Sequence, residues 1–254
     1  MGRAESGVRD LARGTHGVPP VKRLIVIPAF NEARRLPDVL RKVAERVPDF
    51  ETVVVDDGSI DGTGAVAAQA GARVLRHPFN LGYGGALQTG YKYAWRVGAE
   101  LLVQMDADGQ HDPADALALV DPVERGELDL VIGSRFLGVG DYRMGALRST
   151  GRALFQGIVR YFGLRVTDPT SGFQAMNRAV LELYMGDAFP TDYPDVDVLL
   201  AAHRHGLRIG ERPVTMAESV RASSLHSGLA PLYYVYKMLL SVWATSMAPR
   251  KAPR

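Results

Sequence analysis

Short apolar runs alternate with amphipathic segments from residue 21 to residue 214, which predicts strands and helices in turn. Because a strand, a tight turn and a helix open a βαβ unit, the pattern predicts an α/β domain. Strands are expected at 21–29, 51–57, 72–76, 101–105, 128–135 and 207–214, with a short one after a turn at 167–173. Helices are expected at 36–43, after 63, through 91–95, and at 117–123, 146–163, 178–185 and 196–205.

The two ends of the chain differ from this middle part. Residues 1–20 lack periodicity and end in two prolines, which predicts a disordered leader before a single domain at 21–226. Residues 227–254 are expected to form an amphipathic C-terminal helix and a basic tail. Tyr and Trp in that helix suit a membrane interface, and the tail suits anionic lipid. The same stripe is also typical of a helix packed on a sheet, so both interpretations stay open.

Composition narrows the function classes. A chain of 254 residues can bury one large core. Its 30 basic and 28 acidic residues give a net charge of +2, which is too balanced for a nucleic-acid-binding surface. The absence of cysteine excludes disulfides, thiolate metal sites and cysteine nucleophiles, and it fits a reducing compartment. With no apolar run of membrane-spanning length and no signal-peptide core, we expect a cytoplasmic protein without transmembrane segments.

The fourth predicted strand ends in an Asp-Ala-Asp-Gly-Gln sequence. In an extended chain, residues two apart point to the same side, so Asp106 and Asp108 are expected to face one point. Two close carboxylates repel unless a cation lies between them, and a divalent cation with Gln110 as a further oxygen ligand meets this need. The alternative is that the acids cap a helix that begins near Pro113.

Polar residues also follow the first two predicted strands. The carboxyl ends of parallel strands converge on the crevice where open α/β sheets bind ligands. Asn31 and Glu32 either cap the first helix or reach a ligand there, and capping is the expected role of Asn31 alone. Asp56 is expected to bond backbone in its turn. Asp57 is expected to contact the ligand, because a carboxylate can accept two hydrogen bonds from a ribose or a base.

A glycine-rich segment at 80–90 precedes the third predicted helix. It fails the dinucleotide fingerprint because Leu87 stands where a glycine is needed, and it fails the P-loop pattern because Tyr91 stands where a lysine is needed. A dinucleotide-dependent oxidoreductase is therefore disfavoured. The glycines either let this helix pack close to the sheet or contact a phosphate. Further along, a strand ends in Arg135, whose guanidinium suits a phosphate or a carboxylate.

Six motifs stand in one order along the chain: Pro28-Ala-Phe-Asn-Glu32, Asp56-Asp-Gly-Ser-Ile-Asp-Gly-Thr63, Gly82-Tyr-Gly-Gly-Ala86 with Gly90, Asp106-Ala-Asp-Gly-Gln-His111, Gly133-Ser-Arg135 and Asp168-Pro-Thr-Ser-Gly-Phe173. This order resembles the family 2 glycosyltransferases with the GT-A fold, in the polyprenyl-phosphate (dolichol-phosphate mannosyltransferase-like) branch, over residues 21–240. The resemblance implies a mostly parallel sheet flanked by helices.

The resemblance also implies site residues. It implies that Asp106, Asp108 and Gln110 hold a divalent metal, Mg²⁺ or Mn²⁺, and that Arg135 and Arg148 meet the acceptor or donor phosphate. Asp106, Asp108, Arg135 and Arg148 are thus the expected catalytic residues. The residues expected to bind the nucleotide sugar are Pro28, Ala29, Asn31, Glu32, Val55, Asp57, Gly85, Asp106, Ala107, Asp108, Arg135 and Arg221.

One segment departs from the family pattern. Members of this branch usually carry an Arg, and often Gly-x-Ser-Lys, after the last strand. Here Arg221 and Ser224 are kept, but Leu225 stands where Lys is expected. Arg221 is the expected phosphate contact, with His226 a weaker candidate, and a solvent-exposed arginine is the alternative.

The acceptor can be argued from its chemistry. A lipid monophosphate is already anionic near neutral pH, whereas a sugar hydroxyl needs a general base. The Glu-Asp base and Gln-x-x-Arg-Trp signature of chain-building members are both absent. Asp192, Asp195 and Asp197 either provide a base or, as we expect, cap the following helix.

The sequence therefore predicts inverting transfer from a UDP- or GDP-sugar to a polyprenyl monophosphate, for cell-envelope glycan or glycoconjugate assembly. The alternatives are a metal-dependent transferase acting on a sugar hydroxyl and an inactive nucleotide-sugar-binding subunit. The expected partners are the cytoplasmic membrane face, on which the enzyme is peripheral, and a separate integral-membrane protein.

Overall fold

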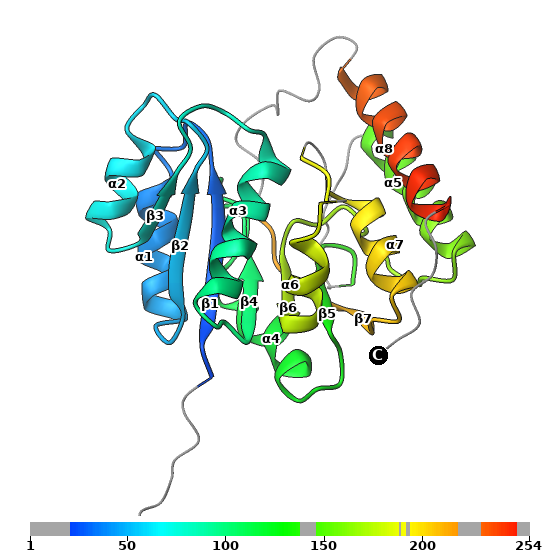
Figure 1. Ribbon diagram of the computed structural model, residues 1–254, viewed down its shortest axis with the longest axis horizontal. Coiled ribbons are helices and arrows are strands. Elements are labelled where there is room, and N and C mark those ends of the chain that lie inside the picture. The colour runs from blue at the N-terminus through cyan, green and yellow to red at the C-terminus, as the bar shows by residue number, and fades with distance from the viewer. Residues whose placement is uncertain (1–20, 138–145, 188, 192–193, 218–229, 248–254) are drawn as a thin grey trace, which may run out of the picture.

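Strands and helices alternate along most of the chain in the computed structural model (Figure 1). The structure describes residues 21–137, 146–187, 189–191, 194–217 and 230–247, without the side chains of 146–152 and 230–234. The strands are β1 Arg23–Ala29, β2 Glu51–Asp56, β3 Arg73–Arg76, β4 Leu101–Gln104, β5 Leu130–Ser134, β6 Gln174–Asn177 and β7 Ile209–Pro213. The helices are α1 Leu36–Arg46, α2 Thr63–Gln69, α3 Tyr83–Arg96, α4 Asp115–Glu124, α5 Ala146–Tyr161, α6 Arg178–Tyr184, α7 Val196–Arg204 and α8 Ala230–Met247.

The seven strands form one sheet in the order β3-β2-β1-β4-β6-β5-β7. β6 runs antiparallel to both of its neighbours, with Leu102 opposite Met176 on one side and Leu130 opposite Met176 on the other. The other neighbouring pairs are parallel. The expectation of a mostly parallel sheet is therefore confirmed, and the carboxyl ends of β1, β2 and β4 lie at one edge.

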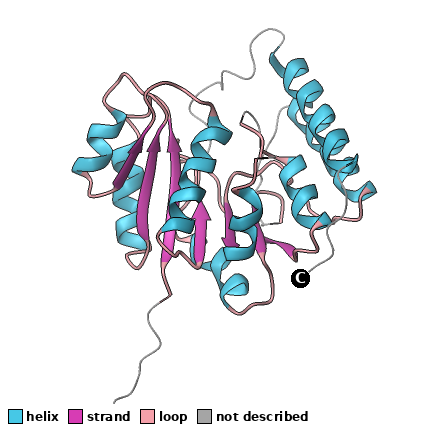
Figure 2. Cartoon of the chain, viewed as in Figure 1, coloured by secondary structure: helices cyan, strands magenta, loops and turns pink. Residues whose placement is uncertain are grey.

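Helices cover both faces of the sheet, and the strands are apolar on both sides for that reason. In β1, Leu24 and Val26 belong to the core formed with α3, α5, α6, α7 and α8. Ile25 and Ile27 point the other way, into the core formed with α1, α2 and α4. The continuous apolar runs of the sequence thus correspond to a three-layer arrangement, with the sheet in the middle (Figure 2).

One glycine sets how closely α3 approaches the sheet. A Cβ atom added to Gly90 would lie 2.3 Å from Cγ1 of Val26 on β1, a distance that no side chain tolerates. Gly90 therefore serves helix packing, which was one of the two interpretations of the glycine-rich segment.

The last helix, α8, packs on α7 and has two unlike faces. Met238 and Val242 are buried, and the Ser241 hydroxyl donates a hydrogen bond to the Asp197 carboxylate. The opposite face is apolar and open: Tyr236 is 62% exposed and Trp243 is 61% exposed. No helix in the described parts of the chain combines the length and hydropathy needed to cross a bilayer.

Candidate active site

The loops that follow β1, β2 and β4 contain half of the residues predicted for the site, including Asn31, Asp57 and Asp106. They leave the same edge of the sheet because these three strands are parallel neighbours. This edge is therefore the candidate active site.

The first two of these loops are joined by hydrogen bonds. Asn31 donates its backbone N–H to Ser59 Oγ at 3.0 Å, and its side-chain oxygen accepts from the Ile60 N–H at 3.1 Å. Glu32 N–H donates to Thr63 Oγ1 at 2.9 Å. The expectation that Asn31 caps the first helix is wrong: α1 begins at Leu36 and has no side-chain cap. Asn31 instead adopts a positive φ of 55°, which Asn tolerates better than most residues, and holds the second loop in place.

The paired acids after β2 have separate roles. Asp56 accepts a hydrogen bond from the Ser59 N–H at 3.0 Å, which confirms the expected turn contact. Asp57 is only 3% exposed and accepts from the N–H groups of Leu81 and Gly82 at 2.9 and 3.0 Å. Its Oδ1 also lies 2.7 Å from Nδ1 of His77. Asp57 thus fixes the start of α3, while its contact with a nucleoside stays a prediction.

The acid pair lies in a turn rather than in a strand. Because β4 ends at Gln104, the extended geometry expected for 106–108 is wrong. The alternative, capping, is also wrong, since α4 has no side-chain cap and the Asp108 carboxylate accepts from the Gln110 N–H at 2.9 Å. Burial raises the pKa of Asp108, and the negative charge of Asp106 raises it further. The negative charges of the two carboxylates therefore interact, and nearby cationic groups do not balance them fully.

This environment fits a cation. No group of three or more His, Cys, Asp or Glu side chains in the described residues is arranged to hold a metal by itself. Binding of a divalent cation by Asp106, Asp108 and Gln110 stays a prediction, in which phosphate oxygens would fill the remaining coordination positions.

Two aromatic residues, Tyr83 and His111, contact Asp106. Tyr83, although 37% exposed, donates its hydroxyl proton to Oδ1 of Asp106 at 2.8 Å. Desolvation and the Asp106 charge raise the pKa of Tyr83 well above its ordinary value. His111 is 5% exposed, accepts from the Asp106 N–H at Nδ1 and stacks on Phe173 with ring centroids 4.7 Å apart. Burial lowers the pKa of His111.

Tyr83 and His111 had no role in the prediction from sequence, although both stand inside the six motifs. Gln104 was missed as well. Gln104 could have been identified in the sequence because it is a polar residue at the last position of a buried strand.

Arg135 is held by a second network. Its guanidinium forms a bidentate ion pair with Asp168, with both N···O distances at 2.6 Å, and Asp168 is fully buried. The turn that contains Asp168 is held by Glu211 on β7. The Glu211 carboxylate accepts hydrogen bonds from the N–H groups of Thr167 and Asp168 at 2.7 and 2.9 Å. The sequence predicted that Arg135 binds a phosphate or a carboxylate, and in the structure it binds the carboxylate of Asp168. A phosphate contact stays a prediction.

The other predicted residues fall into three groups. Pro28, Ala29, Val55 and Ala107 are buried, and their contact with a nucleotide stays a prediction. Gly85 donates its N–H to the Thr191 carbonyl at 3.1 Å, so it packs against that segment. The side chain of Arg148, on α5, and the whole of Arg221, Ser224, Leu225 and His226 lie outside the described residues.

The candidate bases differ in position. Asp197 is 3% exposed and accepts from the N–H groups of Asp195 and Val198 as well as from Ser241, so it serves structure. Asp195 stands at the start of α7 but makes no side-chain cap, contrary to expectation. Its charge contributes to the raised pKa of Tyr83, which puts it within electrostatic range of the site. Asp192 lies outside the described residues.

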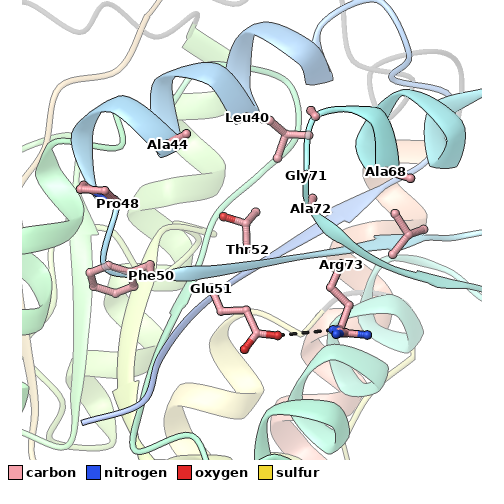
Figure 3. Close-up of a pocket in the computed structure, with 12 residues that line it drawn as sticks. Leu40, Ala44, Pro48, Phe50, Glu51, Thr52, Ala68, Gly71, Ala72 and Arg73 are labelled. Atoms are coloured by element: carbon pink, nitrogen blue, oxygen red, sulfur yellow. Dashed lines mark ion pairs between the residues drawn. The ribbon is translucent and has the colours of Figure 1, made fainter. Parts of the chain in front are cut away.

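A cavity of about 930 Å³ lies elsewhere, between α1, α2 and the first residues of β2 and β3 (Figure 3). Phe50 lines it, and Glu51 pairs with Arg73 across its mouth at 3.4 Å. Because it lies at the amino ends of these strands, it is separate from the candidate active site.

Comparison with known proteins agrees with this geometry. A family model described as glycosyl transferase family 2 matches residues 24–184. The polyprenol monophosphomannose synthase of Mycolicibacterium smegmatis is 33% identical over 222 residues, 83% of each chain. The undecaprenyl-phosphate mannosyltransferase of Micrococcus luteus is 34% identical over 216 residues, 81% of this chain and 87% of that one.

The fold has a solved counterpart. Glucosyl-3-phosphoglycerate synthase from Mycobacterium tuberculosis, crystallised with Mn²⁺, UDP-glucose and phosphoglyceric acid, superposes with a TM-score of 0.69 at 22% identity. The alignment covers 90% of this chain and 81% of that one. The architecture is therefore the GT-A fold.

Proposed function

The chain belongs to glycosyl transferase family 2 and is a glycosyltransferase, and we propose that it moves a sugar from a nucleotide-diphosphate sugar to a polyprenyl monophosphate. The observation that carries the proposal is the identity of 33% and 34%, over four-fifths of the chain, with two relatives named for polyprenyl-phosphate mannosyl transfer. Their names make mannose the first sugar to test.

The proposed reaction is a single displacement. An oxygen of the lipid phosphate attacks the anomeric carbon, the bond from that carbon to the donor diphosphate breaks, and its electron pair leaves with the diphosphate. The configuration at the anomeric carbon inverts. A divalent cation, Mg²⁺ or Mn²⁺, supplies charge neutralisation for the leaving diphosphate when it is bound at Asp106 and Asp108 with Gln110.

The protein's own residues orient the two reactants. The loops joined by Asn31 and Glu32 border the space proposed for the nucleoside, together with Asp57. Arg135, fixed by buried Asp168, would face an anionic acceptor or donor phosphate with little freedom to turn away. Arg148 and Arg221 are proposed to add positive charge. Such positioning lowers the entropic part of the barrier.

The proposed acceptor lies in a bilayer, which gives the exposed face of α8 a role. We propose that this face rests on the cytoplasmic surface of the membrane, where Tyr236 and Trp243 suit the interface. A separate integral-membrane protein would then receive the glycolipid.

A second function has one specific observation in its favour. The charge of Asp195 acts on Tyr83, so a carboxylate lies within electrostatic range of the residue that hydrogen-bonds Asp106. That carboxylate is a candidate general base for transfer to a sugar hydroxyl.

Release of nucleoside diphosphate and formation of glycolipid would test these proposals. GDP-mannose and a panel of other GDP- and UDP-sugars are supplied with Mg²⁺ or Mn²⁺, with and without polyprenyl monophosphate. We expect turnover only with the lipid and a loss of at least about 100-fold in Asp108→Ala, since a metal ligand stabilises the leaving group. Lys92→Ala, an exposed change on α3, is the control.

The outcomes separate the two functions. Turnover that is indifferent to the lipid would contradict the proposed acceptor. Lipid-independent transfer to a sugar hydroxyl that disappears in Asp195→Asn would establish the second function instead.

A further inference from the structure

The Asp106 carboxylate is the end point of a chain of side-chain hydrogen bonds that runs out of the core. We propose that Tyr83 is a positioning residue for Asp106, and that Gln104 and Tyr91 in turn hold Tyr83. This inference rests on the proposed role of Asp106 in holding a divalent cation. It assigns a function to a tyrosine of the glycine-rich segment.

The chemistry of the groups fixes the direction of every bond in the chain. An ionised carboxylate only accepts, so the Tyr83 hydroxyl must give its one proton to Asp106 Oδ1, 2.8 Å away. Tyr83 Oη then accepts from Nε2 of Gln104 at 3.2 Å. The amide oxygen of Gln104 is left to accept from the Tyr91 hydroxyl. Reversing any one bond would leave two donors or two acceptors facing each other.

The inner members of the chain cannot exchange their partners for water. Gln104 is 3% exposed and Tyr91 is 1% exposed. The side chain of Asp106, by contrast, is 30% exposed. The network therefore extends from a rigid core to a carboxylate at the surface of the site, and it engages one of that carboxylate's two oxygens. Residues that orient metal ligands commonly do this.

The backbone on both sides keeps Tyr83 in place. Asp57 accepts from the N–H groups of Leu81 and Gly82, immediately before Tyr83. On the other side, a Cβ atom added to Gly172 would lie 2.9 Å from Tyr83 Oη and 3.0 Å from Asp106 Oδ2. Gly172 is therefore needed for space at the contact between Tyr83 and Asp106.

Mn²⁺ binding tests the proposal without turnover. Free Mn²⁺ is measured by electron paramagnetic resonance while the ion is titrated into protein saturated with UDP or, in parallel, GDP. Tyr83→Phe keeps the ring and removes the hydroxyl. We expect its Kd for Mn²⁺ to rise about tenfold, the range found when a residue behind a metal ligand is changed.

Tyr93→Phe is the matched control. Tyr93 is on the same helix, but its hydroxyl bonds Glu51, away from the acids. Its Kd for Mn²⁺ should match that of the unmodified protein. Metal-free affinity for the nucleoside diphosphate should be unchanged in both variants, because Tyr83 is not among the residues proposed to contact the nucleoside.

The proposal is overturned if Tyr83→Phe binds Mn²⁺ as tightly as the unmodified protein, or if Tyr93→Phe weakens binding equally. Should Tyr83→Phe fold poorly, Gly172→Ala displaces the same contact from the other side and should also weaken Mn²⁺. If Asp106→Asn leaves Mn²⁺ affinity unchanged, the inference and the proposed metal site fail together. If lipid-dependent turnover is not observed but the differences in Mn²⁺ affinity are, only the proposed acceptor is rejected.

Discussion

At the scale of single residues, several charged groups in this protein are held by networks of hydrogen bonds. Asp129 is an example away from the active site. It accepts hydrogen bonds from the backbone and guanidinium of Arg208 and from Asn177. These contacts join the start of β5 to the end of β6 and the start of β7. Hydrogen bonds from Arg208 lower the pKa of Asp129.

The lowered pKa predicts a pH-dependent contribution to stability. The charged form of Asp129 is favoured in the folded state, so its contribution is present above the pKa of an unfolded Asp, about 3.9, and disappears as the pH falls through the folded value. We expect Asp129→Asn to be less stable than the unmodified protein at pH 7. The gap should narrow as the pH falls below about 4.

Urea unfolding at pH 7, 5, 4 and 3.5 measures this gap. Asp38→Asn, whose side chain is 79% exposed, is the control and should stay within about 0.5 kcal/mol of the unmodified protein throughout. A gap for Asp129→Asn that is constant over this range, or that widens in acid, would contradict the prediction.

At the scale of elements, the contact of α3 with β1 depends on Gly90. We expect Gly90→Ala to destabilise the protein by about 1–3 kcal/mol, because its methyl group would overlap Val26 and push helix and strand apart. Urea unfolding measures the loss.

Gly157, on α5, offers a control of opposite sign. A Cβ atom there meets nothing within 4 Å, so Gly157→Ala should stabilise by up to about 1 kcal/mol through helix propensity. Equal effects of the two substitutions would show that propensity, and not packing on β1, governs Gly90.

Elements were easier to predict from the sequence than the contacts between them. Each strand and helix predicted between residues 21 and 214 has a counterpart, because long apolar runs and helical spacing are strong signals. The antiparallel direction of β6 had no such signal, since direction depends on partners distant in the chain. For the same reason the sequence indicated that Asp106 and Asp108 act together, but it could not reveal that Tyr83 and His111 contact Asp106.

Asn31 shows a second limit. Its type and position fit a helix cap, and the same side-chain oxygen fits a neighbouring loop equally well. Only the packing of the loop after β2 decides between them. Local pattern therefore identified the polar groups of the site, while the fold selected their partners.

At the scale of the whole molecule, α8 presents an exposed face that carries Tyr236, Leu240 and Trp243. We expect the protein to sediment with vesicles of anionic lipid and polyprenyl phosphate. Trp243→Ser and Leu240→Ser should each weaken this binding roughly tenfold, because less apolar surface would be buried in the bilayer. Leu240 is 47% exposed. Leu117→Ser on α4, where Leu117 is 52% exposed, is the control and should bind like the unmodified protein.

Two results would contradict membrane docking through α8. One is failure of the unmodified protein to sediment with these vesicles. The other is an equal loss in Leu117→Ser, which would mean that any exposed leucine contributes and that α8 is not the docking face.

The insertion of β6 between β4 and β5 makes assembly of the sheet depend on a segment synthesised after both. Until residues 174–177 leave the ribosome, β4 has an unpaired edge of apolar strand, and β5 has no route to the rest of the sheet. A nascent chain that stalls before this point would expose a surface prone to pair with other chains. The strand that completes the middle of the sheet thus also covers an edge that could otherwise pair with another chain during synthesis.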